Sequence, residues 1–282
     1  MIIDSHTHVV PEFLKLDRAT YLDRDTTFGT LHRNTKIPLA TSQDLLESMD
    51  EEEVDAAVMV GFGWTNKDLA AAANDDLLEQ ARRSGGRLIP FCSVNPSWGK
   101  AAIAEVERCA IGGAKGIGEL HPDTQGFNLT DHPTMEPLVE IALKHNLAIL
   151  IHTSEPVGHQ YVGKGTVTPE IILQFIEHFP EANIILAHFG GGLPFYALMP
   201  EVKNSLTNVY FDSAAAPFLY TPDAFRVTAD LVGIDHILMG SDFPLIHTKR
   251  LVDEVLQSGL STREQALVLG ENAAKLYNIS IT

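Results

Sequence analysis

Short apolar segments rich in β-branched residues alternate along the chain with longer segments whose apolar positions recur at helical spacing. Continuous apolar runs of this kind are typical of strands that are buried on both faces. Eight are predicted to be strands: residues 1–7, 56–61, 88–94, 114–120, 148–153, 183–188, 209–213 and 236–241. Strands that alternate with helices form a parallel sheet, and eight such units in 282 residues fit a closed (β/α)8 TIM barrel.

The segment after the first predicted strand bears on which parallel fold the chain adopts. An open doubly wound sheet, the alternative, places a glycine-rich phosphate loop there. The strand instead ends in Ser5-His6-Thr7-His8, which cannot cradle a pyrophosphate. Because the sequence contains no repeat, low-complexity tract or linker, residues 1–282 are predicted to form a single barrel domain.

Residues 9–40 form a long connection after the first strand, and no convincing helix is predicted there. Loops of this length in compact domains are usually functional or disordered. The connection starts at the end of the barrel where active sites form, so we expect a lid over the mouth. Its arginines, Arg18, Arg24 and Arg33, are candidates to grip a substrate carboxylate, whereas His32 is expected to be solvated. A surface arm for subunit contact is the alternative.

Polar side chains end the predicted strands, where a (β/α)8 barrel places its active site. His6 and His8 lie two residues apart on the first strand, so both imidazoles are expected to point into the barrel. Nitrogen and oxygen ligands without thiolates suit a catalytic Zn²⁺, with Mn²⁺ or Fe²⁺ as alternatives. The candidates at the other strand ends are Glu119, His152, His188 and Asp242, while the facing of Asp212 is left open.

Further residues near the strand ends are candidates for the pocket. Trp64 and Trp98 follow the second and third strands and are predicted to form an apolar wall. His159 and His247 follow the fifth and eighth strands, so either could contact substrate at the mouth. Asp4 shares the alternation of His6 but lies deeper, and we expect it to form hydrogen bonds in the core.

The charge balance narrows the class of partner. The chain has 37 acidic and 20 basic side chains, with a formal net charge of −17. This argues against nucleic acid or an anionic membrane surface and favours a small-molecule partner. Two cysteines are too few for a disulfide scaffold, and no signal-peptide pattern opens the sequence, so a cytoplasmic location is expected.

Four motifs at strand ends resemble those of the amidohydrolase superfamily. They are most similar to its amidohydrolase 2 branch, which also contains aminocarboxymuconate-semialdehyde decarboxylase and resorcylate-type decarboxylases. Residues 269–277 are similar to the last-helix signature of that branch. The four motifs are Asp4-Ser5-His6-Thr7-His8, Ile151-His152-Thr153, Ala187-His188-Phe189-Gly190-Gly191 and Gly240-Ser241-Asp242-Phe243-Pro244.

The resemblance implies a role for each matching residue. His6, His8, His152 and Asp242 would be metal ligands, and Asp242 would also take a proton from metal-activated water. His188 would polarise or protonate the substrate. The lysine that bridges two metals in some members has no counterpart, because Lys115 lies near the start of its strand. One metal is therefore expected, with Glu119 as a candidate extra ligand, and branch members are often homodimers.

These observations together predict an enzyme. The leading interpretation is a metal-dependent hydrolase that attacks an ester or amide bond of a small anionic substrate. The alternative is a metal-dependent non-oxidative decarboxylase of an aromatic or enoic acid, a carboxy-lyase. A barrel that only binds its ligand would have no use for a general base, so the presence of His188 and Asp242 argues against that third class.

Overall fold

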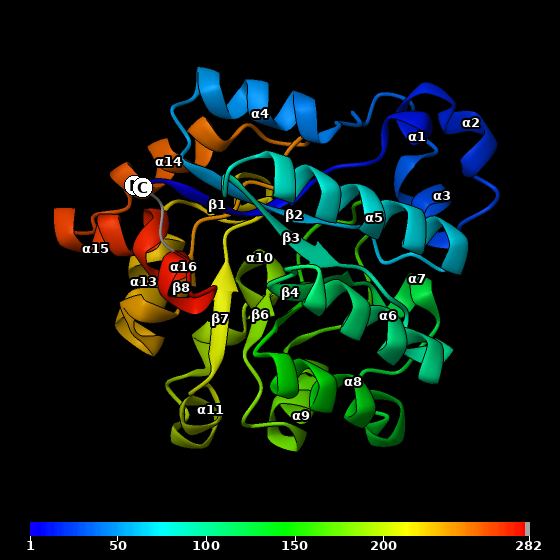
Figure 1. The fold of residues 1–282 in the computed structure, drawn as a ribbon. Helices are drawn as coiled ribbons and strands as arrows, with labels where there is room; N and C mark the ends of the chain where they lie inside the picture. Colours follow the sequence, from blue (N-terminus) through cyan, green and yellow to red (C-terminus); the bar gives the residue numbers. More distant parts are fainter. Residues whose placement is uncertain (280–282) are drawn as a thin grey trace.

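The computed structural model of the protein describes residues 1–279 and contains the predicted barrel (Figure 1). Its eight strands are all parallel and follow each other around the sheet in chain order. Backbone hydrogen bonds close the barrel between the last strand and the first, from Ser5 to Met239 at 2.8 Å and from His8 to Phe243 at 2.7 Å. The strands are β1 (Ile3–His8), β2 (Ala56–Val60), β3 (Leu88–Cys92), β4 (Gly116–Leu120), β5 (Ala148–Ile151), β6 (Ile184–Leu186), β7 (Val209–Asp212) and β8 (Ile237–Leu238).

Helices surround the sheet, and the longer ones alternate with the strands (Figure 1). Both capping boxes in the sequence form, Thr41 with Asp44 and Ser261 with Glu264. No helix within residues 1–279 is long and apolar enough to cross a membrane. The longer helices are α4 (Ser42–Glu51), α5 (Lys67–Arg83), α6 (Lys100–Ile111), α8 (His132–His145), α9 (Pro169–His178), α13 (Asp223–Val232) and α14 (Thr248–Gln257).

Short helical turns fill the connections between these elements. They include α7 (Pro122–Gln125), α10 (Ala187–Gly190), α11 (Pro200–Ser205), α12 (Ala216–Leu219), α15 (Thr262–Ala266) and α16 (Asn272–Leu276). The remaining turns are η1 (Pro96–Trp98), η2 (Leu193–Tyr196), η3 (Ile234–His236) and η4 (Leu267–Glu271).

The long connection after β1 is not irregular, so the prediction that it lacks helices is wrong. It contains α1 (Glu12–Leu16), α2 (Arg18–Tyr21) and α3 (Thr26–His32), each too short for a helical period to be legible in the sequence. Asp25 fixes the segment in place. One carboxylate oxygen caps α3 at Phe28 (2.9 Å), and the other accepts hydrogen bonds from the backbone of Thr65 (2.7 Å) and Asn66 (2.8 Å).

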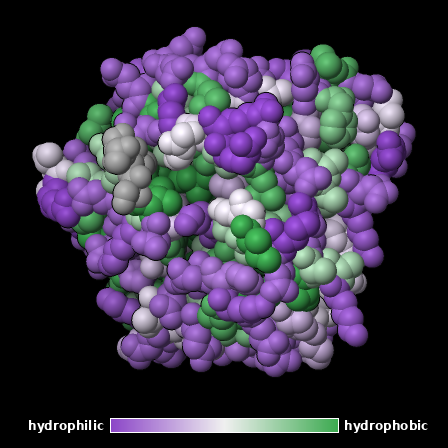
Figure 2. Space-filling model, viewed as in Figure 1, coloured by the Kyte–Doolittle hydropathy of each residue, from purple (hydrophilic) through white to green (hydrophobic). Residues whose placement is uncertain are grey.

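Apolar side chains fill the barrel on both sides of its wall. A cluster that includes Val58, Phe91 and Leu150 packs inside the sheet and meets Tyr277. A larger cluster lies between the strands and the outer helices. The outer surface on the face drawn in Figure 2 is mostly hydrophilic. The interior is thus a packed core and not a channel, which leaves the ends of the strands for a site.

Asp4 does not share a face with His6, because the pairing of β1 with β2 shifts register between Asp4 and Thr7. Its carboxylate accepts hydrogen bonds from the hydroxyl of Thr248 in α14 (2.5 Å) and from the backbone of Ser241 (2.9 Å). The expected alternation with His6 is therefore wrong, whereas the expected core hydrogen bonding is confirmed. The contact joins β1 to α14.

Gly116 gives the ring of Phe91 the room it needs inside the barrel. A Cβ at position 116 would lie 2.3 Å from a ring carbon of Phe91. Since packed cores resist added volume, Gly116→Ala should lower the free energy of unfolding by about 1–3 kcal/mol in urea titrations. The double variant Gly116→Ala/Phe91→Leu should lose less than the sum of its two single variants. Additive losses would contradict the contact.

Candidate active site

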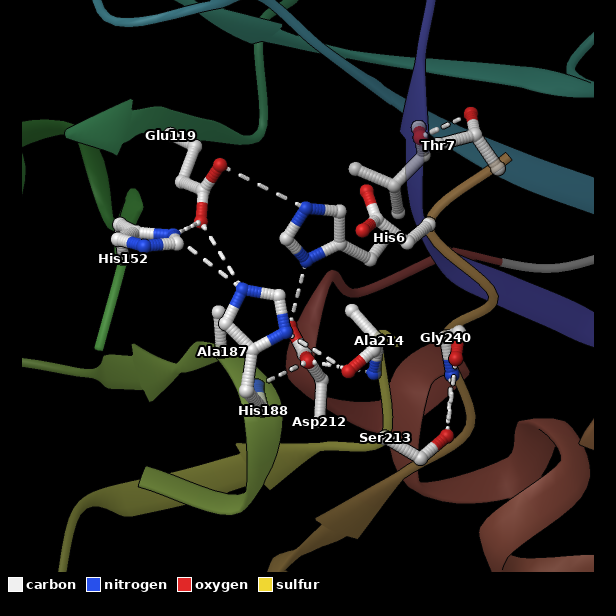
Figure 3. Close-up of polar contacts among 12 residues, drawn as sticks. His6, Thr7, Glu119, His152, Ala187, His188, Asp212, Ser213, Ala214 and Gly240 are labelled. Carbon is white, nitrogen blue, oxygen red and sulfur yellow. Dashed lines mark hydrogen bonds and ion pairs between the residues drawn. The ribbon is translucent and has the colours of Figure 1, made fainter. Parts of the chain in front are cut away.

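Six of the predicted strand-end residues converge at one end of the barrel, and Figure 3 shows His6, Glu119, His152 and His188 among them. His6 and His8 come from β1, and Glu119 comes from β4. The remaining three directly follow strands: His152 follows β5, His188 lies in α10 after β6, and Asp242 follows β8. The carboxyl ends of parallel strands share one rim, which brings together residues that lie far apart in the sequence.

Three of the imidazoles are oriented by hydrogen bonds on the side away from the cluster, and Figure 3 shows those of His6 and His188. His6 donates from Nδ1 to Asp212 at 2.8 Å, and His188 donates from Nδ1 to the Ala214 carbonyl at 2.7 Å. His152 donates from Nε2 to the Gly163 carbonyl at 3.0 Å. In each neutral ring the other nitrogen then carries a lone pair that faces the cluster. Metal-binding histidines are held in the same way.

The spacing of the inward atoms suits a divalent ion. His6 Nε2 and His8 Nε2 are 3.1 Å apart, and His8 Nε2 lies 3.3 Å from Asp242 Oδ1 and 3.5 Å from Glu119 Oε2. Ligands around a tetrahedral ion are about 3.3–3.4 Å from each other, given ligand bonds of about 2.0–2.1 Å. Glu119 belongs to two such groups, one with His6 and His8 and another with His152 and His188.

The electrostatics of the cluster also favour a cation. Burial would raise the pKa of Glu119, but the neighbouring His121 and His152 hold that pKa well below its usual range. Burial likewise opposes ionisation of Asp242, whereas His8 and His6 lower its pKa. For His6, burial disfavours the charged ring, yet Asp212 and Glu119 raise its pKa to about 10. Buried carboxylates thus attract positive charge to this point, and the site is one for a divalent metal.

Two residues of the cluster have left-handed backbone conformations. The φ angle is +58° at His188 and +71° at Asp242. Such angles cost roughly 1–2 kcal/mol per residue for side chains other than glycine. Strain of this kind persists where the surrounding structure imposes it and is concentrated at functional sites. Here it accompanies the two residues for which a chemical role was predicted.

A cavity of about 410 Å³ opens directly over the cluster. Its floor consists of His8, Glu119, His121, His152, His188 and Asp242. The walls are mostly apolar and come from residues 10, 31–32, 37–40, 62, 159, 161–163, 215, 218–219 and 244–245. Small-molecule sites commonly combine an apolar wall with a few convergent polar groups in a volume of this order.

Four predicted pocket residues have different fates. His159 lines the cavity. His247 does not, because its side chain is exposed and pairs with Glu52 at 2.8 Å. Neither tryptophan lines the cavity: Trp64 is fully buried against Phe28, and Trp98, in η1, lies under the ammonium of Lys67 from α5. The aromatic residue after β2 that does reach the cavity is Phe62, whose ring stacks on that of His8 with the centroids 4.6 Å apart.

The three arginines of the long connection lie outside the cavity lining. Arg18 donates to the backbone carbonyls of His32, Asn34 and Ile37. Arg24 lies over a tyrosine ring of α2, and Arg33 pairs with an aspartate of the same segment. The expected arginine contact with substrate is therefore not prepared in this structure. Instead His32, expected to be solvated, is buried and lines the cavity.

Two polar residues of the site were not predicted as such. Asp212, whose facing was open, holds His6 and also accepts a hydrogen bond from the backbone of His188 at 3.2 Å. His121 donates to Glu119 at 2.8 Å and stacks on His152. Both lie at strand ends, so their position in the sequence could have identified them as site residues. The orientation of their side chains could not be predicted in this way.

Comparison with known proteins separates the family from the reaction. A sequence model of the amidohydrolase family matches residues 3–279. 6-Methylsalicylic acid decarboxylase of Penicillium expansum is 24% identical over 188 residues, which cover 55% of this chain and 56% of that protein. This chain thus aligns with little more than half the length of the curated relative.

Solved structures share the fold at low identity. 5-Carboxyvanillate decarboxylase of Sphingomonas paucimobilis superposes with a TM-score of 0.81 at 17% identity, over 99% of both chains. Dihydroxybenzoic acid decarboxylase of Polaromonas, solved with manganese and 2-nitroresorcinol, gives a TM-score of 0.75 at 17% identity, over 98% of this chain and 96% of that one.

The leading prediction of a hydrolase is corrected by these relatives. The curated relative and the neighbours just described are decarboxylases, which favours the alternative that the sequence left open. The prediction of a hydrolase rested on metal-activated water, but a set of imidazole and carboxylate donors does not by itself specify whether water is added. The match over residues 3–279 shows that the chain belongs to the amidohydrolase family.

Proposed function

We propose that the protein is a metal-dependent non-oxidative decarboxylase of an aromatic acid. The observation that carries the proposal is the position of a mostly apolar cavity directly over convergent imidazoles and carboxylates. An aromatic ring fits such walls, while its carboxylate would be directed to the charged floor. The decarboxylases among the relatives support this assignment.

The metal would be held by His6, His8, His152 and Asp242, with Glu119 as an extra ligand. Nitrogen-rich donors suit Zn²⁺, and the manganese in a structural neighbour makes Mn²⁺ the second candidate. When bound, such a cation supplies the Lewis acidity that holds the substrate carboxylate and stabilises the charge left on the ring.

The chain's own residues supply exclusion of water and a proton. In the overall reaction the bond between the ring and the carboxylate breaks, CO₂ leaves, and a proton takes its place on the ring carbon. We assign the donor to His188, because its Nδ1 is committed to the Ala214 carbonyl and its Nε2 faces the cluster, where it would take up a proton and pass it to the ring carbon. Asp242, whose side chain is 14% exposed, lines the cavity and is placed to return a proton to the site.

Release of CO₂ is the first expected outcome. The protein loaded with Mn²⁺ or Zn²⁺ should form CO₂ and the corresponding phenol from at least one acid among 6-methylsalicylate, 2,6-dihydroxybenzoate and 5-carboxyvanillate. His8→Ala, which lacks a proposed ligand, is the negative control. Product analysis distinguishes this reaction from hydrolysis of an ester and amide panel. Hydrolysis of a panel member without CO₂ release from any acid would contradict the proposal.

Variants of a metal ligand and of the proton donor should differ in the amount of metal that they retain. His8→Ala should lose bound metal and CO₂ release together. His188→Gln should retain the metal and lower kcat by about 10²–10⁴-fold, the usual contribution of a general acid. His247→Ala, at an exposed position outside the cavity, serves as the matched control. If His188→Gln instead releases half of a two-metal content, His188 is a ligand and a different donor is needed.

Asp212 should affect metal affinity without contacting the cavity. Asp212→Asn weakens the hydrogen bond that orients His6, and changes to such outer partners typically lower metal affinity about 10–100-fold. Competition with a fluorescent chelator measures the affinity, and Asp230→Asn on the exposed face of α13 provides the control. Equal affinities of the two variants would show that the orientation of His6 does not depend on this carboxylate.

A further inference from the structure

The carboxylates of the cavity lining are confined to its floor. The lining includes the carboxylates of Glu119 and Asp242 and several imidazoles, but no lysine or arginine among the described residues 1–279. A substrate carboxylate would therefore find its positive counterpart only at the metal-binding cluster. An anionic group farther out would have none.

Two basic side chains that contact the segments of the wall, Arg18 and Lys164, are engaged by backbone carbonyls. The Arg18 guanidinium donates to three backbone carbonyls within residues 32–37, so it supports the wall from behind. The Lys164 ammonium donates to the carbonyls of Val157 (2.8 Å) and His159 (3.0 Å) in the loop beside the mouth. Neither cation is free to balance an anion inside the cavity without giving up these bonds.

Outside the floor the lining is mostly apolar, and its polar side chains are His32, His159 and Tyr161. Leu31, Ile37 and Leu39 belong to it, together with Leu219 of α12. His32 stacks on Phe28 at 4.7 Å and donates from Nδ1 to the Phe28 carbonyl at 3.2 Å. Burial, with the nearby His8 and Arg18, lowers the pKa of His32 to about 3, so this ring is uncharged at neutral pH.

We propose that this wall makes the site selective for aromatic acids with a single carboxylate and an apolar ring substituent, and that it rejects aromatic dicarboxylates. The inference rests on the proposed function, since it concerns the same site. A buried anion without a partner is strongly disfavoured, whereas each buried methyl group improves binding by about fourfold. The wall formed by residues 31–32 and 37–39 therefore determines which acid binds, while the residues of the floor carry out the decarboxylation.

Matched pairs of ligands test this selectivity by binding alone. Calorimetry on the Mn²⁺-loaded protein at pH 8 compares 2-, 3- and 4-methylbenzoate with phthalate, isophthalate and terephthalate. The two members of each pair differ only by a methyl group in place of the second carboxylate. Each methylbenzoate should bind at least tenfold more tightly than its partner. Any dicarboxylate that binds within tenfold of its methyl partner overturns the proposal.

Two variants at one position test the role of charge. Leu219→Arg introduces a cation into the wall. In at least one pair it should lower the ratio of the methylbenzoate affinity to the dicarboxylate affinity by fivefold or more. Leu219→Gln introduces polarity without charge and should leave that ratio unchanged. The inference is contradicted if Leu219→Arg leaves the ratio of affinities between methylbenzoate and dicarboxylate unchanged in every pair. It is also contradicted if Leu219→Gln lowers that ratio as much as Leu219→Arg does.

The outcomes separate this inference from the proposed function. Preferred binding of the methylbenzoates without CO₂ release from any acid means that the decarboxylase assignment fails and the selectivity stands. CO₂ release together with equal binding of dicarboxylates means the reverse. Failure of every benzoate to bind, together with no CO₂ release from any acid, rejects both.

Discussion

Negative charge buried at the rim of the barrel is the constraint on which the rest of the site depends. Glu119 and Asp212 are almost completely buried and Asp242 is nearly so, and all three lie within reach of the histidines. Carboxylates in such surroundings need positive partners. The oriented imidazoles direct lone pairs to the same point, so they do not neutralise the charge unless they are protonated. A divalent cation satisfies the carboxylates and the lone pairs together.

The barrel meets this constraint through the direction of its strands. Each strand delivers a side chain to the same rim, so residues as distant as His6 and Asp242 become neighbours without a dedicated folding motif. The backbone then departs from strand geometry to complete the arrangement. Left-handed angles at His188 and Asp242 turn these chains toward the cluster, and packing of the buried loops maintains them.

The strands and their terminal residues could be predicted because each rests on a local signal, apolar runs and polar ends. Features that depend on packing could not. The register shift in β1 separates Asp4 from His6, although simple alternation pairs them. Charge makes Arg18 one of three candidates to bind a substrate carboxylate, but three backbone carbonyls accept its hydrogen bonds instead. Trp64 was assigned to the wall from its position after β2, whereas Phe62, two residues earlier, takes that place.

The attachment of residues 9–40 has an evolutionary consequence. The carboxylate of Asp25 joins this segment to the loop after β2 through bonds to Phe28, Thr65 and Asn66, independently of every rim histidine. The segment is thus anchored to the barrel separately from the residues that would bind the metal. Substitutions or small insertions in this segment would leave the metal-binding residues in place. Related enzymes could therefore acquire different substrates while they keep the same reaction.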